Sequence, residues 1–151
     1  MTGLWSVVIP ESAEVTNLVI NPSGETNVTG YTKVSTGAAT ADTSKQRRGY
    51  RSVAMTCTTA VGDGFIYDSV TLVDTTGYVM AFDFWGVNAI PYTAFFADTA
   101  GTLTGTAITW TGSGQWTREV VPYSATASAA FSLRIVKNNS ENTGDIYLDG
   151  L

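Results

Sequence analysis

Apolar residues along this chain recur at every second position in short runs, and turn-forming residues interrupt these runs at short intervals. Period-two alternation is typical of β-strands with one buried face, and clusters of Gly, Asp, Asn and Ser are typical of turns. The pattern predicts strands at 6–9, 17–20, 31–36, 50–59, 65–73, 78–86, 92–97, 102–110, 115–123, 130–137 and 145–150.

No stretch between these strands has the period of a crossover helix. Short strands without crossover helices indicate an all-β fold in which two antiparallel sheets pack face to face, a β-sandwich or jelly roll. We expect an N-terminal segment or edge strand at 1–16 and the sandwich module at 17–151.

Alternation also assigns the side chains of each strand to a face of its sheet. In the run YVMAFDFW at 78–85, Met80, Phe82 and Phe84 share one side, which we expect to be core. Asp83 and Trp85 lie on the opposite side and are expected to project from the outer face of the sheet.

The run AFSLRIV at 130–136 places Arg134 on the side opposite its apolar residues, so Arg134 is also expected on an outer face. Asp83, Trp85 and Arg134 would suit a polar, flat-faced ligand such as a sugar ring, through stacking and hydrogen bonds. They would equally suit a cross-strand Asp–Arg pair beside a Trp that a loop or another subunit covers. Further candidates for a glycan platform are Tyr67, Tyr92 and Tyr147.

Composition excludes several classes of protein. Of the 151 residues, 44% are hydrophobic, which excludes a disordered chain. The net charge is −5 and the chain has eight Lys and Arg in all, which argues against nucleic acid or an anionic membrane as a partner. The local basic segment Lys45-Gln-Arg-Arg48 is interpreted as a solvated loop.

Histidine is absent and Cys57 is the single cysteine. Ser-His and Cys-His catalytic pairs, His-ligated zinc and an internal disulfide are therefore excluded. Carboxylates are available for a glycosidase pair, but nothing in the sequence brings two of them together, so we expect no enzyme activity. The N-terminus shows no signal peptide, and no run reaches the roughly 18 apolar residues of a membrane span.

The stretch NLVINPSGE at 17–25 ends an apolar run against Asn-Pro-Ser-Gly and places Glu25 just beyond the turn. Pro22 and Gly24 do not allow the strand to continue. A carboxylate held beside a strand end is either a surface charge or a ligand for a cation.

The order of five segments resembles the CenC-type carbohydrate-binding modules grouped around families 4, 9 and 22, which are galactose-binding-domain-like jelly rolls. Their pattern runs Asn-Leu-x-x-Asn-Pro-x-Phe-Glu, Gly-x-x-Ser-Leu-x-Val, Gly-x-x-Tyr-x-x-Ser-Phe, a Trp strand and a closing Tyr-Ile-Asp-Asp. Domains of this pattern are also common in phage tail and other virion proteins. The resemblance covers residues 17–151 and rests on NLVINPSGE, GYRSVAMT, TGYVMAFDFWG, GQWTREVVPYSATASAAFSLRIV and GDIYLDG.

This sequence departs from the pattern in places. Gly24 stands where the family has Phe, and Gly150 replaces the second Asp of the closing motif. The Trp that usually follows the acid is replaced near Tyr31. Trp116 matches the family's buried Trp at a strand start, so the resemblance assigns it to packing.

The resemblance also implies a structural calcium ion. In many of these modules the Glu after the Pro turn and the Asp of the last strand hold calcium together with loop carbonyls. Carried over, Glu25 and Asp149 would be the side-chain ligands, with carbonyls from 45–48 nearby, which supplies the oxygens that calcium prefers. Alternatively, Arg47 or Arg48 neutralises Glu25 directly.

Two functions follow as expectations. The first is a non-catalytic, glycan-binding adhesion or decoration domain of a larger assembly such as a phage virion, which binds a polysaccharide or cell-surface glycan. The second is a structural domain of a capsid or tail, where the same face meets another protein chain or a further copy in a homo-oligomer. The apolar residues of MTGLWSVVIPES suit the second function. Either function places the protein outside the cell or on a virion surface.

Overall fold

The computed structural model describes residues 17–19, 24–34, 38–141 and 144–151, and these residues form strands and no helix. Accordingly, no helix long and apolar enough to cross a membrane occurs among them. The strands are β1 (Tyr31–Lys33), β2 (Thr40–Asp42), β3 (Ser52–Cys57), β4 (Gly64–Leu72), β5 (Gly77–Trp85), β6 (Pro91–Ala97), β7 (Leu103–Thr111), β8 (Trp116–Ser124), β9 (Ala129–Lys137) and β10 (Gly144–Asp149).

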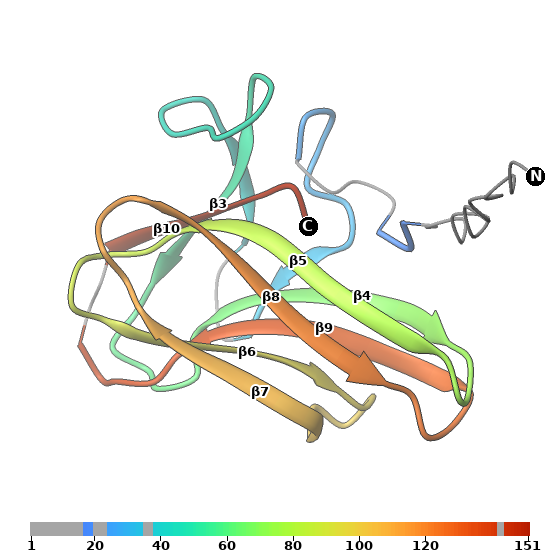
Figure 1. Cartoon of the computed structure of the whole chain (residues 1–151). Helices are drawn as coiled ribbons and strands as arrows, with labels where there is room; N and C mark the ends of the chain where they lie inside the picture. Colours follow the sequence, from blue (N-terminus) through green and yellow to red (C-terminus); the bar gives the residue numbers. More distant parts are fainter. Residues whose placement is uncertain (1–16, 20–23, 35–37, 142–143) are drawn as a thin grey trace, which may run out of the picture.

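The strands form two five-stranded sheets that lie one over the other (Figure 1). One sheet has the order β1-β4-β9-β6-β7 and the other has the order β2-β3-β10-β5-β8. Every strand pair in them is antiparallel. The predicted all-β sandwich is therefore confirmed.

The predicted strand limits agree closely with the structure from β4 onward, where each limit lies within about one residue of the observed one. β2 was not predicted, because Thr40-Ala-Asp42 is too short to show alternation. Asn17–Val19 are not in a strand, contrary to the prediction for 17–20. The predicted strand at 6–9 and the segment 1–16 lie outside the described residues, so the boundary at residue 17 stays a prediction.

The core lies between the two sheets, on the faces that alternation assigned to it. Phe82 and Phe84 are fully buried and Met80 nearly so, as expected for the inner face of β5. Trp110 on β7 packs into this core, with its ring centroid 5.3 Å from that of Phe84. Cys57 is buried as well, which confirms that it is a core thiol.

The edge strand β8 pairs only with β5 in its sheet, and it contains Pro122. Proline has no backbone N–H and is found at sheet edges for this reason. On the outer face of this strand pair, Pro122 lies opposite Val79, and Val120 lies opposite Ala81. Val79 and Val120 are exposed, which leaves an apolar patch on the outer face of the pair.

Substitution on the two faces of β5 tests this assignment of core and surface. We expect Phe82→Ala to lower the free energy of unfolding by about 3–5 kcal/mol, because it removes a fully buried ring. We expect Val79→Ala, on the exposed face of the same strand, to change it by no more than about 0.5 kcal/mol. Urea denaturation followed by circular dichroism measures both, and equal losses would contradict the assignment.

Candidate functional site

Three aromatic side chains occupy adjacent positions on the outer face of the sheet β2-β3-β10-β5-β8. Tyr147 on β10 pairs in register with Trp85 on β5, and Trp85 pairs with Trp116 on β8. The ring centroids of Trp85 and Tyr147 are 5.5 Å apart in an edge-to-face arrangement. We call Tyr147, Trp85 and Trp116 the aromatic row.

A row of charged side chains runs beside the aromatic row on the same face. Asp149 pairs in register with Asp83, and Asp83 pairs with Arg118. Each of these residues is two positions from a member of the aromatic row, so both rows point away from the core. We call Asp149, Asp83 and Arg118 the polar row.

The loop at 43–51, between β2 and β3, is tied to the sheet at both of its ends. Asp42 accepts a hydrogen bond from the backbone N–H of Ser44 (2.6 Å), and the Ser44 hydroxyl also donates to it. The Ser44 hydroxyl is the main cause that lowers the pKa of Asp42 below its ordinary value. At the other end, the hydroxyl of Ser52 donates to the carbonyl oxygen of Lys45.

Asp149 holds the middle of this loop. Its Oδ2 accepts hydrogen bonds from the backbone N–H groups of Arg47 (2.9 Å) and Arg48 (2.7 Å), and the residue is fully buried. Burial raises the pKa of Asp149, and the nearby charges of Asp83 and Glu25 raise it further, although the two N–H bonds act in the opposite direction. Its Oδ1 is buried and has no hydrogen-bond partner among the described residues.

Glu25 holds the end of the loop. Its Oε1 accepts hydrogen bonds from the backbone N–H groups of Tyr50 (2.8 Å) and Arg51 (3.1 Å). Gly49 has a positive φ of 66°, and a Cβ at this position would lie 2.1 Å from that same oxygen. The close approach of Glu25 therefore requires glycine here.

Asp83 is buried and shared between two arginines. Its Oδ2 lies 2.9 Å from Nε of Arg48 and 3.2 Å from an Nη of Arg118, which also donates to the carbonyl oxygen of Gly150. The structure thus contains the cross-strand Asp–Arg pair that the sequence left open, with Arg118 as the partner. Burial of an unpaired carboxylate is costly, and the two guanidinium groups offset that cost.

The loop, Trp85 and Trp116 line an open pocket of about 470 Å³. Lys45 places its Nζ 4.5 Å from the ring centroid of Trp85 and 5.6 Å from that of Tyr147. A cation over an aromatic face at a partly exposed site contributes about 0.5–1 kcal/mol. The pocket is lined by Ser44, Lys45, Gln46, Arg47, Trp85, Gly114, Gln115 and Trp116.

The predicted platform of Asp83, Trp85 and Arg134 is not assembled. Arg134 lies on β9 in the other sheet, where it pairs with Ile66 and Phe95 and donates from Nε to the Ser132 hydroxyl (3.3 Å). Alternation correctly placed all three residues on outer faces. It does not say which sheet a strand joins, and β5 and β9 join different sheets.

The predicted tyrosines divide between the interior and the site. Tyr67 and Tyr92 are buried in the core, where Tyr67 contacts Tyr31 and Tyr92 contacts Phe84. Their rings therefore cannot extend a surface platform. Tyr147 does lie on the outer face, in the aromatic row, where it is covered.

The resemblance assigned Trp116 to packing, but the structure places it elsewhere. It is only partly buried, and it lines the pocket beside Trp85. Alternation along β8 contained the signal, because Trp116 is out of phase with the buried residues Val121 and Tyr123. Lys45 and Arg47 were assigned to a solvated loop, and no sequence signal placed them in the lining of this pocket.

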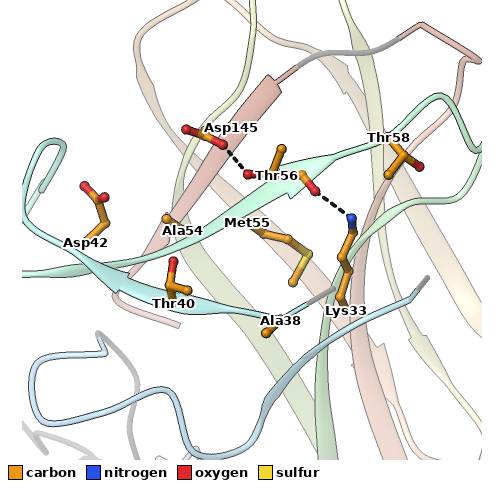
Figure 2. A pocket seen from close by; sticks show the side chains of 9 residues that line it. All are labelled: Lys33, Ala38, Thr40, Asp42, Ala54, Met55, Thr56, Thr58 and Asp145. Atoms are coloured by element: carbon orange, nitrogen blue, oxygen red, sulfur yellow. Dashed lines mark hydrogen bonds between the residues drawn. The ribbon is translucent and has the colours of Figure 1, made fainter. Parts of the chain in front are cut away.

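A second cleft of about 450 Å³ lies where β1, β2 and β3 come together (Figure 2). Figure 2 shows Nζ of Lys33 bonded to the carbonyl oxygen of Thr56 (2.6 Å), and the Thr56 hydroxyl bonded to Asp145 (2.5 Å). Lys33 also pairs with the buried Asp63 at 3.2 Å. The charged groups of this cleft are thus bonded within the protein, and none of the described residues that line the cleft is aromatic. The cleft therefore suits a sugar less well.

No family model matches the sequence, and no curated protein matches it. Solved structures do match. The C-terminal family 22 carbohydrate binding module of Clostridium thermocellum Xyn10B has a TM-score of 0.67 at 15% identity, over 85% of this chain and 86% of that one. TmCBM61, solved in complex with β-1,4-galactotriose, has a TM-score of 0.64 at 14% identity, over 90% of this chain and 96% of that one.

Similar domains also occur within longer chains. Arabinose-bound MgGH51 α-L-arabinofuranosidase has a TM-score of 0.67 at 14% identity, over 85% of this chain and 23% of its own. The enzymatically active domain of bacteriophage CBA120 tailspike protein 4 has a TM-score of 0.58 at 15% identity, over 89% of this chain and 20% of its own. The resemblance to carbohydrate-binding modules is therefore confirmed at the level of the fold.

The pKa of Asp149 gives a prediction of how stability depends on pH. Because the folded protein raises this pKa, the stabilising contribution of Asp149 is complete below the unfolded pKa of about 3.9 and is lost as pH rises through the folded value. We expect the free energy of unfolding of the wild type, relative to Asp149→Asn, to fall as pH rises above about 4 and through the folded pKa of Asp149. Denaturant titrations across this range measure the difference.

Asp42 provides a control of opposite sign. Its pKa is lowered in the folded protein, so its contribution is present above the unfolded pKa and is lost as pH falls through the folded value. The wild type relative to Asp42→Asn should therefore gain stability as pH rises toward the unfolded value of about 3.9 and stay level above it. The same slope for both variants would contradict the environment described for Asp149.

Proposed function

We propose that this chain is a non-catalytic glycan-binding domain whose ligand lies on the aromatic row and in the adjoining pocket. The observation that carries the proposal is the register of Trp85 and Trp116 on two neighbouring strands, which are about 4.8 Å apart, with both indoles lining the pocket. A flat aromatic face suits the C–H face of a sugar ring. The amides of Gln46 and Gln115 suit its hydroxyl groups.

The pocket supports glycan binding without catalysis. A glycosidase needs a pair of carboxyl groups that flank the scissile bond. Among the described residues that line the pocket there is no Asp or Glu. The nearby carboxylates of Asp149 and Asp83 are used to hold the loop and two arginines.

The fold supports the same proposal. The solved modules that share it are named for carbohydrate binding, and one of them holds β-1,4-galactotriose. The match within a bacteriophage tailspike protein supports an adhesion or decoration role on a virion or another extracellular surface. The partner in this role is a polysaccharide or a cell-surface glycan.

Substitution of the two indoles tests the proposal. We expect Trp85→Ala and Trp116→Ala each to weaken binding of an array glycan at least about tenfold, because loss of stacking on one ring is worth roughly 1.4 kcal/mol. Isothermal titration of the glycan that the wild type binds on an array measures the change. Circular dichroism confirms that each variant keeps the fold.

Two further variants make the result specific. Tyr50→Ala removes an aromatic residue that is 79% exposed and lies outside the pocket, so binding should be unchanged. Arg134→Ala probes the outer face of the other sheet, where the sequence also predicted a glycan contact. Loss of binding in Arg134→Ala alone would place the site on that face and refute the aromatic row.

An assembly domain of a capsid or tail is the second candidate function. The observation that favours it is the exposed apolar patch of Val79, Ala81, Val120 and Pro122, beside the polar row on β5 and β8. Exposed apolar patches often mark contacts with other proteins. A stable oligomer without glycan affinity in a solution mass measurement favours this function, and a monomer that binds glycan favours the first.

We also propose a structural calcium ion between Glu25 and Asp149. The buried Oδ1 of Asp149 is without a hydrogen-bond partner among the described residues, and Oε1 of Glu25 is engaged by two N–H groups, so each carboxylate has one oxygen to offer. The charge of Glu25 raises the pKa of Asp149, which a cation would relieve. The described residues contain no cluster of three or more His, Cys, Asp and Glu, so carbonyls and water would complete the shell.

Thermal denaturation with calcium and with a chelator tests this proposal. Calcium at about a hundred times its Kd stabilises a folded protein by about 2.7 kcal/mol, which corresponds to a Tm increase of roughly 5–10 °C for a chain of this size. Glu25→Gln keeps an acceptor for the N–H groups of Tyr50 and Arg51 but removes the charge, so it should abolish the increase. An unchanged Tm in the wild type would exclude the ion.

A further inference from the structure

The charged side chains that line the pocket are all cationic. They are Lys45 and Arg47, and the remaining lining is made of Trp, Gln, Ser and Gly. Within the described part of the chain, neither Lys45 nor Arg47 forms an ion pair. This contrasts with Arg48 and Arg118, whose charges are offset by Asp83.

Among the described residues, none of the carboxylates around the pocket forms an ion pair with Lys45 or Arg47. Asp149 accepts two backbone N–H groups, Asp83 is shared by two arginines, and Glu25 holds the N–H groups of Tyr50 and Arg51. Asp42 is bonded to Ser44, and the charge of Lys45 makes the smallest of the contributions that lower its pKa. The positive charge of the pocket is therefore left for a ligand.

This concentration of positive charge is local. The whole chain has thirteen acidic and eight basic residues, yet four of those eight lie within seven positions of the loop, at 45, 47, 48 and 51. An anionic protein repels anionic ligands at long range, but screening limits that repulsion to about 8–10 Å at physiological salt. At the pocket itself, the nearby cations Lys45 and Arg47 make the electrostatic potential positive.

The position of Lys45 adds a second argument. Its ammonium group lies over the face of Trp85, which is the surface that a sugar ring would use. A neutral sugar has to displace this cation and gives it no new partner of opposite charge. A sugar that carries an acid draws the ammonium group away from the indole into a charge-assisted hydrogen bond, and so uncovers the ring.

We infer that the ligand of this pocket is an acidic saccharide, which carries a carboxylate or a sulfate. The acid binds to Lys45 and Arg47, the sugar ring stacks against Trp85 and Trp116, and the Gln46 and Gln115 amides bond to hydroxyl groups. This inference rests on the proposed glycan-binding function. It adds the chemical class of the ligand and the role of Lys45 as a displaceable cover of Trp85.

The test uses pairs of probes that differ only in charge. Trigalacturonic acid is compared with its trimethyl ester, and a sulfated galactan oligosaccharide without carboxyl groups is compared with its desulfated form, on an array that also carries other neutral glycans. We expect the wild type to bind at least one acidic member about tenfold or more tightly than its neutral partner, with an affinity that falls as salt rises. The carboxylate pair and the sulfate pair distinguish the two kinds of acid.

Charge-matched variants assign the preference to the pocket. Lys45→Gln and Arg47→Gln should each remove most of the acidic preference, and Lys45→Gln should strengthen binding of the neutral member because Trp85 is uncovered. Arg51→Gln removes the same charge from an exposed residue outside the pocket, so it should keep the preference. An equal loss in all three variants would show nonspecific attraction and overturn the inference.

The remaining outcomes separate this inference from the function on which it rests. Binding of neutral glycans with no acidic preference, lost in Trp116→Ala, would overturn the inference and leave the proposed function in place. Binding of an acidic glycan that survives Trp85→Ala and Trp116→Ala would overturn both the stacking and the site. Absence of binding to every glycan on the array would overturn the function and the inference together.

Discussion

The candidate site depends on the carboxylate of Asp149. This carboxylate joins β10, the last strand along the chain, to the loop at 43–51 that forms one wall of the pocket. It accepts hydrogen bonds from two backbone N–H groups of that loop. Asp83 and Glu25 secure the same loop on either side. The position of Lys45 over Trp85 and that of Arg47 in the pocket lining follow from these contacts.

Most of the fold could be predicted from the sequence, and the reason is the strength of alternation in long strands. The limits of β4 to β10 lie close to the predicted ones because most of these strands bury one face and end at or just before Gly, Asp, Asn or Ser. β2 escaped prediction because three residues are too few to show a period. The pairing of strands was not predictable, because alternation gives the face of a side chain and not its neighbours across the sheet.

The candidate site was predicted only in part for the same reason. Trp85 and Tyr147 were identified correctly as outer-face residues, whereas Arg134 lies on the opposite sheet and Tyr92 lies in the core. Trp116 was misassigned because the family pattern outweighed the alternation of its own strand. Lys45 lies over Trp85 because of the loop at 43–51. The conformation of a loop is set by tertiary contacts, which no local sequence pattern reveals.

The contacts that hold the loop also bear on the order in which the protein folds. Arg47 and Arg48 are separated from Asp149 by 102 and 101 positions, so their bonds close about two thirds of the length of the 151-residue chain. Contacts between such distant residues form late, after the entropy of closing the intervening segment has been lost. We therefore expect the wall that Lys45 and Arg47 form beside Trp85 to take its place only after β10 has joined the sheet.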